Sequence, residues 1–237
     1  MIDEDYQAWE LYPQYRWVFN KLEIALKLGY RAGPACTPLP STLNHYKVII
    51  RPIYNLYGMG IGAKVCTFIP EIDNDFIIHH GHIPPGYFWC EYFEGTHYSI
   101  DYKATNASKD SLFRWESFHA MIGEHSEKNL TKFTKWKCVK SPKIKLPAFL
   151  NKIIDIDFLN IELIGNKIIE IHLRTGNDIL HNKQIGTVAI PIWKNEEYKI
   201  KELKEQGYKF KNNYHPDSFK YDADGHLNDI RTGYMIK

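Results

Sequence analysis

The segment at residues 153–173 constrains the fold more than any other part of the chain. Two β-branched runs, IIDIDF and KIIEIHL, flank a turn at Gly165 and Asn166, which predicts an antiparallel pair of strands. Each run carries acidic residues where a buried strand is ordinarily apolar. Buried or half-buried carboxylates need partners, and in a sheet such partners are metal ions or cationic groups of a ligand. The segment therefore predicts a sheet with a charged site on one face.

The acidic residues of this segment suit a metal site. Asp157 and Glu170 lie 13 residues apart, and His172 follows Glu170 by two positions, which places both of the latter on one face of a strand. Carboxylate oxygens suit Mg²⁺, which takes one or two protein carboxylates together with substrate phosphates. Arg174, two positions further on, suits a phosphoryl or carboxylate oxygen. A solvated sheet face with alternating charges explains the same pattern, and the residues alone leave both interpretations open.

The composition describes an ordinary globular protein. Of the 237 residues, 44% are hydrophobic and 24% are charged, which excludes wholesale disorder, and the net charge of +2 provides no overall field for nucleic acid or membranes. The four cysteines lie far apart without a C-x-x-C pair, and no apolar run is long enough to span a membrane. The N-terminus is acidic and does not resemble a signal peptide, so we expect a cytoplasmic location.

The remaining elements are predicted from periodicity and turn residues. Residues 14–29 place apolar side chains at a helical period and end at a glycine. Residues 87–102 indicate two strands joined by a short turn, and residues 108–150 indicate a mixed segment that is helical in part. Residues 181–237 indicate a polar helix followed by a hairpin with an Asp-x-Asp-Gly turn.

A glycine-rich loop separates two predicted strands at residues 47–52 and 63–68. Gly58, Gly60 and Gly62 alternate along it and leave backbone N–H groups free to reach phosphate oxygens. The loop has neither the spacing of a P-loop nor that of a Rossmann turn. A flexible hairpin tip is the alternative interpretation.

Four stretches, in order along residues 14–180, resemble the ATP-grasp superfamily, the fold of D-alanine–D-alanine ligase, biotin carboxylase and many carboxylate–amine ligases. The helix that carries Asn20 and Lys21, with the Gly-Pro-rich turn after it, resembles the family's Asp-Lys helix. The strand at residues 48–52 (VIIRP) resembles the family's "vvvKP" strand, and residues 89–101 resemble its hinge beside the adenine. Residues 156–177 resemble its metal site, "vDf … iEvN.rpG".

The resemblance implies an α+β fold in which two lobes with antiparallel sheets sandwich the nucleotide. Residues 1–180 would form this nucleotide-binding region, and residues 181–237 would be an extension packed on the same domain, where it would supply a substrate pocket or a dimer surface. The implied cofactors are ATP and Mg²⁺, with Mn²⁺ as an option. The implied reaction joins a carboxylate to an amine or similar nucleophile through an acyl phosphate.

The family's functional residues carry over to matching positions of this chain. The resemblance implies that Lys21 and Arg51 contact the phosphates and that the loop with Gly58, Gly60 and Gly62 closes over the triphosphate. It implies that Glu91 contacts the adenine and the ribose. It also implies that Asp157, Glu170 and His172 bind the metal ion and that the catalytic Arg174 steadies the acyl phosphate.

Several positions depart from the family pattern. Arg51 stands where Lys is usual, and His97 stands where many members have Glu. His172 replaces the usual Asn, and a neutral imidazole suits Mn²⁺ better than the hard Mg²⁺ ion. The domain that usually precedes the fold is not visible ahead of Lys21, so the second substrate does not follow by analogy. Small stand-alone members from bacteriophages are similar in this respect, which would place the protein in the host cytoplasm.

Two other classes of function stay open. The chain would be an ATP-binding regulatory protein if the departures at Arg51 and His172 have removed ligation. It would be a polyanion-binding module if the lysine run at residues 132–145, with Phe133 and Trp136 between its lysines, grips phosphates, although such runs are more often solvated faces. For the ligase we expect carboxylate and amine substrates, no membrane or nucleic acid partner, and a homodimer as an option.

A histidine-rich stretch offers a further metal interpretation. His79, His80 and His82 lie within four residues of one another, but no fourth ligand follows at a familiar spacing. We therefore expect a solvated loop there.

Overall fold

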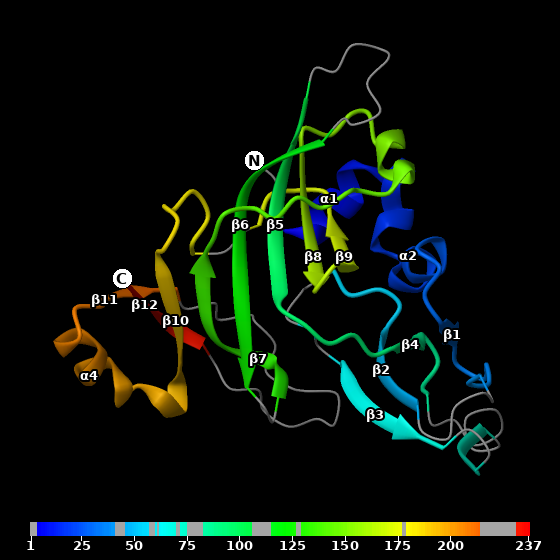
Figure 1. The fold of residues 1–237 in the computed structure, drawn as a ribbon, viewed down its shortest axis with the longest axis horizontal. Coiled ribbons are helices and arrows are strands. Elements are labelled where there is room, and N and C mark those ends of the chain that lie inside the picture. The colour runs from blue at the N-terminus through cyan, green and yellow to red at the C-terminus, as the bar shows by residue number, and fades with distance from the viewer. Residues whose placement is uncertain are drawn as a thin grey trace.

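The chain folds around two antiparallel sheets (Figure 1). The computed structural model describes residues 4–40, 46–56, 60, 62–69, 72–74, 83–105, 115–126, 129–176, 179–213 and 231–237. The smaller sheet has the strand order β1-β4-β2-β3, with the strands β1 (Ala32–Pro34), β2 (Tyr46–Pro52), β3 (Lys64–Phe68) and β4 (Tyr87–Glu91).

The larger sheet has the strand order β11-β12-β10-β7-β6-β5-β8-β9. Its strands are β5 (His97–Ala104), β6 (Trp115–Ser126), β7 (Asn129–Cys138), β8 (Phe158–Ile164), β9 (Lys167–His172), β10 (Val188–Trp193), β11 (Lys209–Asn212) and β12 (Arg231–Ile236). With two such sheets and a few short helices, the chain has the α+β class that was expected.

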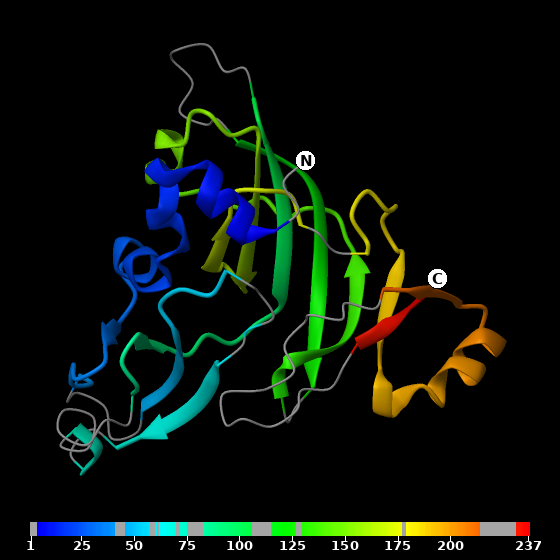
Figure 2. The same ribbon diagram turned by 180° about the vertical axis from the view of Figure 1, so that it is seen from behind.

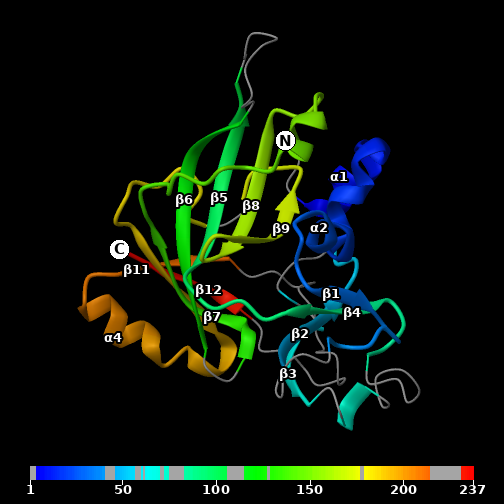
Figure 3. The same ribbon diagram turned by 45° about the vertical axis from the view of Figure 1, so that its right-hand side comes forward.

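The N-terminal helices lie beside β9, the edge strand of the large sheet (Figure 3). They are α1 (Asp5–Leu11), the 3₁₀ segment η1 (Pro13–Phe19) and α2 (Lys21–Lys27). The single helix predicted over residues 14–29 is therefore wrong in part, because the chain breaks at Asn20, whose side-chain oxygen accepts a hydrogen bond from the Glu23 N–H at 3.0 Å and caps α2. Gly29, with φ of +74°, ends this region as predicted.

Several strands confirm the sequence prediction, and two regions correct it. β2, β3 and the β8–β9 hairpin form where β-branched runs predicted them. The two strands expected over residues 87–102 exist as β4 and β5, but they lie in different sheets, so the turn between them connects the two sheets. The region 115–138, expected to be helical in part, forms the long antiparallel strands β6 and β7.

The C-terminal region extends the large sheet at the edge opposite β9 (Figure 2). β10 pairs with β7, and β12 lies between β10 and β11. The predicted polar helix is shorter than expected: α4 (Lys199–Glu205) follows the short 3₁₀ turn η3 (Lys194–Glu196). The Asp-x-Asp-Gly turn lies outside the described residues. At about 4.8 Å per strand, β10 is about 24 Å from β9, so the described part of the extension is remote from that edge.

The main core joins the N-terminal helices to one face of the large sheet. Its buried members include Ala8, Val18, Phe19 and Ile24 from the helical region and Ile100, Leu159, Ile161 and Ile171 from the strands. The alternate residues of the same strands face the other way and carry the polar groups described below. Among the helices in the described ranges, none has the length and apolar character needed to cross a membrane.

Candidate functional site

Two cations that lie 30 positions apart in the sequence meet at β9. Lys21 begins α2, and its Nζ lies 2.8 Å from Glu170 Oε1. Arg51 comes from β2 in the small sheet, and its Nη2 donates a hydrogen bond of 3.0 Å to the carbonyl oxygen of Ile169. Lys21 is 6% exposed and Arg51 is 9% exposed. The point where the small sheet reaches the large one is therefore lined by two buried cations.

The β8–β9 hairpin brings carboxylates to the same place. Its register sets Glu162 opposite Glu170 and Asn160 opposite His172. A bulge at Ile169 of β9 sets this register, since Leu163 pairs with Ile168, and without that extra residue Glu162 would be opposite Ile169 and Glu170 would face the other side of the sheet.

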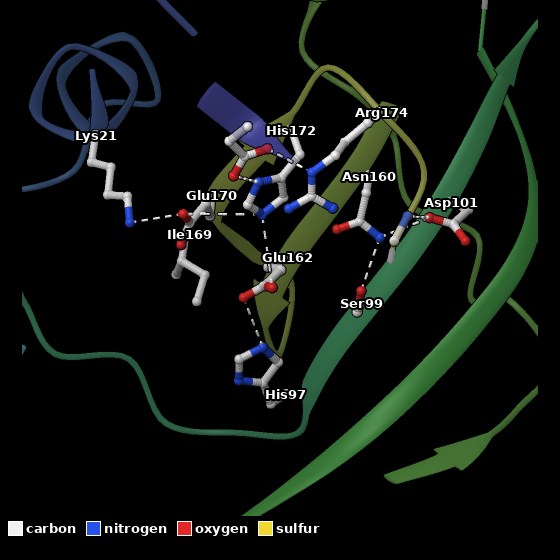
Figure 4. A network of polar contacts seen from close by, with 12 residues as sticks. Lys21, His97, Ser99, Asp101, Asn160, Glu162, Ile169, Glu170, His172 and Arg174 are labelled. Atoms are coloured by element: carbon white, nitrogen blue, oxygen red, sulfur yellow. Dashed lines mark hydrogen bonds and ion pairs between the residues drawn. The ribbon is translucent and has the colours of Figure 1, made fainter. Parts of the chain in front are cut away.

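His172 lies at the centre of this group (Figure 4). Its Nδ1 is 2.7 Å from Asp5 Oδ2, and its Nε2 is 3.8 Å from Glu162 Oε1 and 4.0 Å from Glu170 Oε1. The other Asp5 oxygen accepts a hydrogen bond of 2.8 Å from Arg174 Nε. Three carboxylates (Asp5, Glu162 and Glu170) therefore surround His172, with Lys21 and Arg174 at the border.

The electrostatics of this group keep His172 protonated. Burial lowers the pKa of His172, but the charge and hydrogen bond of Asp5 and the hydrogen bond to Glu162 outweigh burial and raise it to about 10. Burial likewise raises the pKa of Asp5, yet the opposing effects of His172 and Arg174 are larger, so its pKa is lowered. The pKa of Glu162 is also held well below its usual value, because its contacts with His172 and His97 outweigh burial. Asp5 and Glu162 are thus ionised at neutral pH beside a protonated His172.

The structure brings together two of the three expected Mg²⁺ ligands: Glu170 and His172, with Asp5, place ligand atoms within 4.8 Å of one another, whereas Asp157 lies apart. An imidazolium has no free lone pair for a metal, and His172 Nε2 points between the two carboxylates of the hairpin. Glu170 is paired with Lys21 at 2.8 Å. Asp157, the remaining expected ligand, is exposed and precedes β8, about 16 Å along the strand from the Glu162 position. The structure therefore does not bring Asp157 to Glu170.

The other expected site residues have defined surroundings. Glu91 accepts hydrogen bonds of 3.2 and 3.1 Å from Arg31, which tie its carboxylate to the start of β1. Gly60 and Gly62 have φ values of +64° and +75°, which glycine adopts without strain, while Gly58 lies outside the described residues.

The lysine run does not provide a stacking surface. Trp136 is 6% exposed and stacks on Phe133 with ring centroids 4.2 Å apart. Lys132 and Lys135 form ion pairs with Glu196 and Glu124. These contacts favour a solvated, internally paired face over a polyanion groove. The histidine-rich stretch at residues 79–82 lies outside the described residues.

Asp5 and Glu162 are the members of this group that the sequence does not reveal. Asp5 lies 167 positions from His172, and no local pattern connects the two. The two-residue period of β8 could have indicated the face on which Glu162 lies. Pairing the residues outward from the turn would, however, set Glu162 opposite Ile169, and it is opposite Glu170 only because of the bulge.

Comparison with known proteins relates the chain to a fold. No family model matches the sequence, and no curated protein matches it. Among solved structures, L-amino acid ligase from Bacillus licheniformis is similar with a TM-score of 0.57 and 8% identity, covering 94% of this chain and 67% of that one. N5-carboxyaminoimidazole synthetase from Staphylococcus aureus complexed with ADP has a TM-score of 0.54 and 13% identity, covering 99% of this chain and 69% of that one.

A third solved structure is similar to this chain to the same degree. The ADP complex of purK, an N5-carboxyaminoimidazole ribonucleotide synthetase, has a TM-score of 0.56 and 10% identity, covering 98% of this chain and 72% of that one. The chain thus spans about two thirds of the length of the proteins it resembles. At these identities the likeness concerns the fold, and the chain has the ATP-grasp fold that its sequence motifs resemble.

Proposed function

We propose that the chain binds ATP where its two sheets meet and uses it to join a carboxylate to an amine or similar nucleophile through an acyl phosphate. One observation carries this proposal: Lys21 and Arg51, from different parts of the fold, converge on the neighbouring residues Glu170 and Ile169 of β9. Similar solved structures hold ADP, which supports a nucleotide as the ligand.

Arg51 has unused hydrogen-bonding capacity. Its Nε is buried and has no hydrogen-bond partner within the described residues. A buried guanidinium donor without a partner is costly, and a phosphate oxygen would satisfy it with a charge-assisted hydrogen bond. Lys21 adds a second cation from the start of α2. Phosphoryl transfer depends mainly on positioning and on charge neutralisation, which two cations from separate elements provide.

Arg174 and the glycine loop complete the proposal. Arg174 Nε is held by Asp5 and its Nη1 donates to the carbonyl oxygen of Thr175, so the guanidinium is fixed in place to steady an acyl phosphate. Gly60 and Gly62 allow the backbone of the loop to approach the phosphates closely.

The test begins with nucleotide binding. ATP at 100 times its Kd should stabilise the fold by about 2.7 kcal/mol, seen as a rise in Tm with and without added Mg²⁺. Lys21→Met and Arg51→Met should each reduce this rise. Lys27→Met, which removes an exposed lysine from the same helix, is the matched control and should keep it. An unchanged Tm of the wild-type protein at millimolar ATP would contradict the proposal.

ADP release then separates ligation from binding. A panel of amino acids and acidic peptides should stimulate ADP release by the wild-type protein, and Arg174→Met should lose that stimulation while keeping the ATP-dependent rise in Tm. A Tm rise without stimulated ADP release would refute ligation and leave ATP binding intact.

A nucleotide-binding regulatory protein without ligase activity is the second candidate. It is favoured by the position of protonated His172 between Glu162 and Glu170, the place where a ligase would need a metal ion. In that case ATP raises Tm equally well without Mg²⁺, and no panel member stimulates ADP release.

A further inference from the structure

A second polar cluster lies on the large sheet, next to the β8–β9 hairpin of the candidate site (Figure 4). Asp101 on β5 is opposite His119 on β6, and His181 reaches them from the turn before β10. His119 Nδ1 lies 3.4 Å from Asp101 Oδ2, and His181 Nδ1 lies 3.1 Å from the same oxygen. All three ligand atoms lie within 4.8 Å of one another. The cluster adjoins the β8–β9 hairpin, because Asp101 is opposite Asn160 on β8 and Asn160 is opposite His172 on β9.

One nitrogen of His119 faces a carboxylate oxygen at a distance that is long for a hydrogen bond. His119 Nδ1 lies 3.4 Å from Asp101 Oδ2, and its Nε2 lies 3.7 Å from the sulfur of Cys138, whose thiol donates to the carbonyl oxygen of Leu180. A neutral imidazole carries one lone pair, which a metal ion can use. This Nδ1 is buried without a hydrogen-bond partner in the described part of the chain, and the His119 side chain is 9% exposed.

Asp101 is oriented for the same point. Its Oδ1 accepts hydrogen bonds of 2.6 Å from the Gly176 N–H and 2.8 Å from Asn160 Nδ2, which leaves Oδ2 directed at the two histidines. Burial raises the pKa of Asp101, but its contacts with His119, Gly176 and Asn160 outweigh burial and lower it, so the carboxylate is ionised. Metal-binding carboxylates and histidines are commonly held by such outer hydrogen bonds.

The spacing matches a transition-metal site. Zinc bonds of about 2.0–2.1 Å at tetrahedral angles place neighbouring ligand atoms about 3.4 Å apart. The two measured separations from Asp101 Oδ2 are 3.4 and 3.1 Å. Two imidazoles and one carboxylate suit zinc and its neighbours in the first transition row, whereas Mg²⁺ prefers oxygen ligands. The His181 side chain is 24% exposed, so the cluster is open to water on that side.

We propose that Asp101, His119 and His181 bind one divalent transition-metal ion of the zinc class, with water as the remaining ligand. The ion contacts His119 Nδ1 and Asp101 Oδ2, and it gives the buried Nδ1 the partner that it lacks among the described residues. Cys138 is a positioning residue, since it contacts the far nitrogen of the His119 ring.

The test is a zinc titration of the chelator-stripped full chain against a chromophoric zinc indicator. We expect one Zn²⁺ per chain, unaffected by a large excess of Mg²⁺, and a Zn²⁺-dependent rise in Tm. His181→Asn, at a partly exposed turn, and the isosteric Asp101→Asn should each weaken Zn²⁺ binding by at least about 10-fold. Without metal, His181→Asn should still unfold in a single cooperative transition, with a Tm lowered only by the loss of the 3.1 Å hydrogen bond between His181 and Asp101.

The matched control removes the competing histidines of the chain. The triple variant His79→Asn, His80→Asn and His82→Asn should keep the wild-type affinity for Zn²⁺. The proposal is overturned if the wild-type chain binds no stoichiometric Zn²⁺, if His181→Asn binds as tightly as the wild type, or if the triple variant alone loses binding.

Discussion

His172 makes the stability of the fold depend on pH in a range where few other groups titrate. The residue is 4% exposed, and Asp5 and Glu162 raise its pKa from 6.5 to about 10 against the opposing effect of burial. A pKa that is higher in the folded state than in the unfolded chain stabilises the fold fully below the unfolded value. That contribution is lost as the pH rises from 6.5 towards 10.

The magnitude follows from proton linkage. Between these two pKa values the unfolded chain releases the proton while the folded chain keeps it, so the free energy of unfolding falls by up to about 1.4 kcal/mol per pH unit. From pH 6.5 to pH 8.5 the expected loss is about 2 kcal/mol. The upper limit stays below 9.0, the ordinary thiol pKa, so the cysteines of the unfolded chain contribute little.

Urea unfolding at pH 6.5, 7.5 and 8.5, followed by tryptophan fluorescence, measures this slope, since the chain has six tryptophans. His172→Gln keeps a polar side chain of similar size without a proton to titrate. The variant should be less stable at pH 6.5 and nearly independent of pH over this range. A level wild-type stability, or a variant with the wild-type slope, would refute the assignment of a protonated His172.

Three further predictions concern stability measured by the same urea unfolding. Lys21→Met should cost about 3 kcal/mol because it takes the nearest cation from the largely buried Glu170 carboxylate, whereas Lys27→Met, at an exposed pair, should cost less than about 1 kcal/mol. Equal costs would contradict the buried pair. Gly29→Ala should cost about 1 kcal/mol, because an alanine is strained at this positive φ. Gly62→Ala should cost more, because φ is similar there and the new methyl group would also lie 2.5 Å from the Tyr87 hydroxyl. Trp136→Ala should cost about 3 kcal/mol and leave retention on a polyanion resin unchanged; reduced retention at full stability would revive the polyanion module.

The sequence predicted the strands in which the local pattern of apolar and polar residues matches the burial of those residues in the fold. The β8–β9 hairpin follows from two β-branched runs and a glycine with φ of +60° at position 165. The shared face of Glu170 and His172 follows from the two-residue period of a strand. The β6–β7 pair was missed because its lysines, glutamates and small residues carry little strand propensity, and pairing within the sheet outweighs that propensity.

The candidate site, too, was predictable in part from the sequence. The sequence by itself determined the motif order, and with it the expectation that Lys21, Arg51 and the β8–β9 hairpin belong to one site. Only the tertiary structure decided that a bulge in β9 places Glu170 opposite Glu162, that Asp157 lies apart, and that Asp5 reaches His172. The physical reason is the distance along the chain over which each effect acts. Backbone periodicity relates residues that are a few positions apart, whereas the charge state of the buried His172 depends on carboxylates that only folding brings within 4 Å.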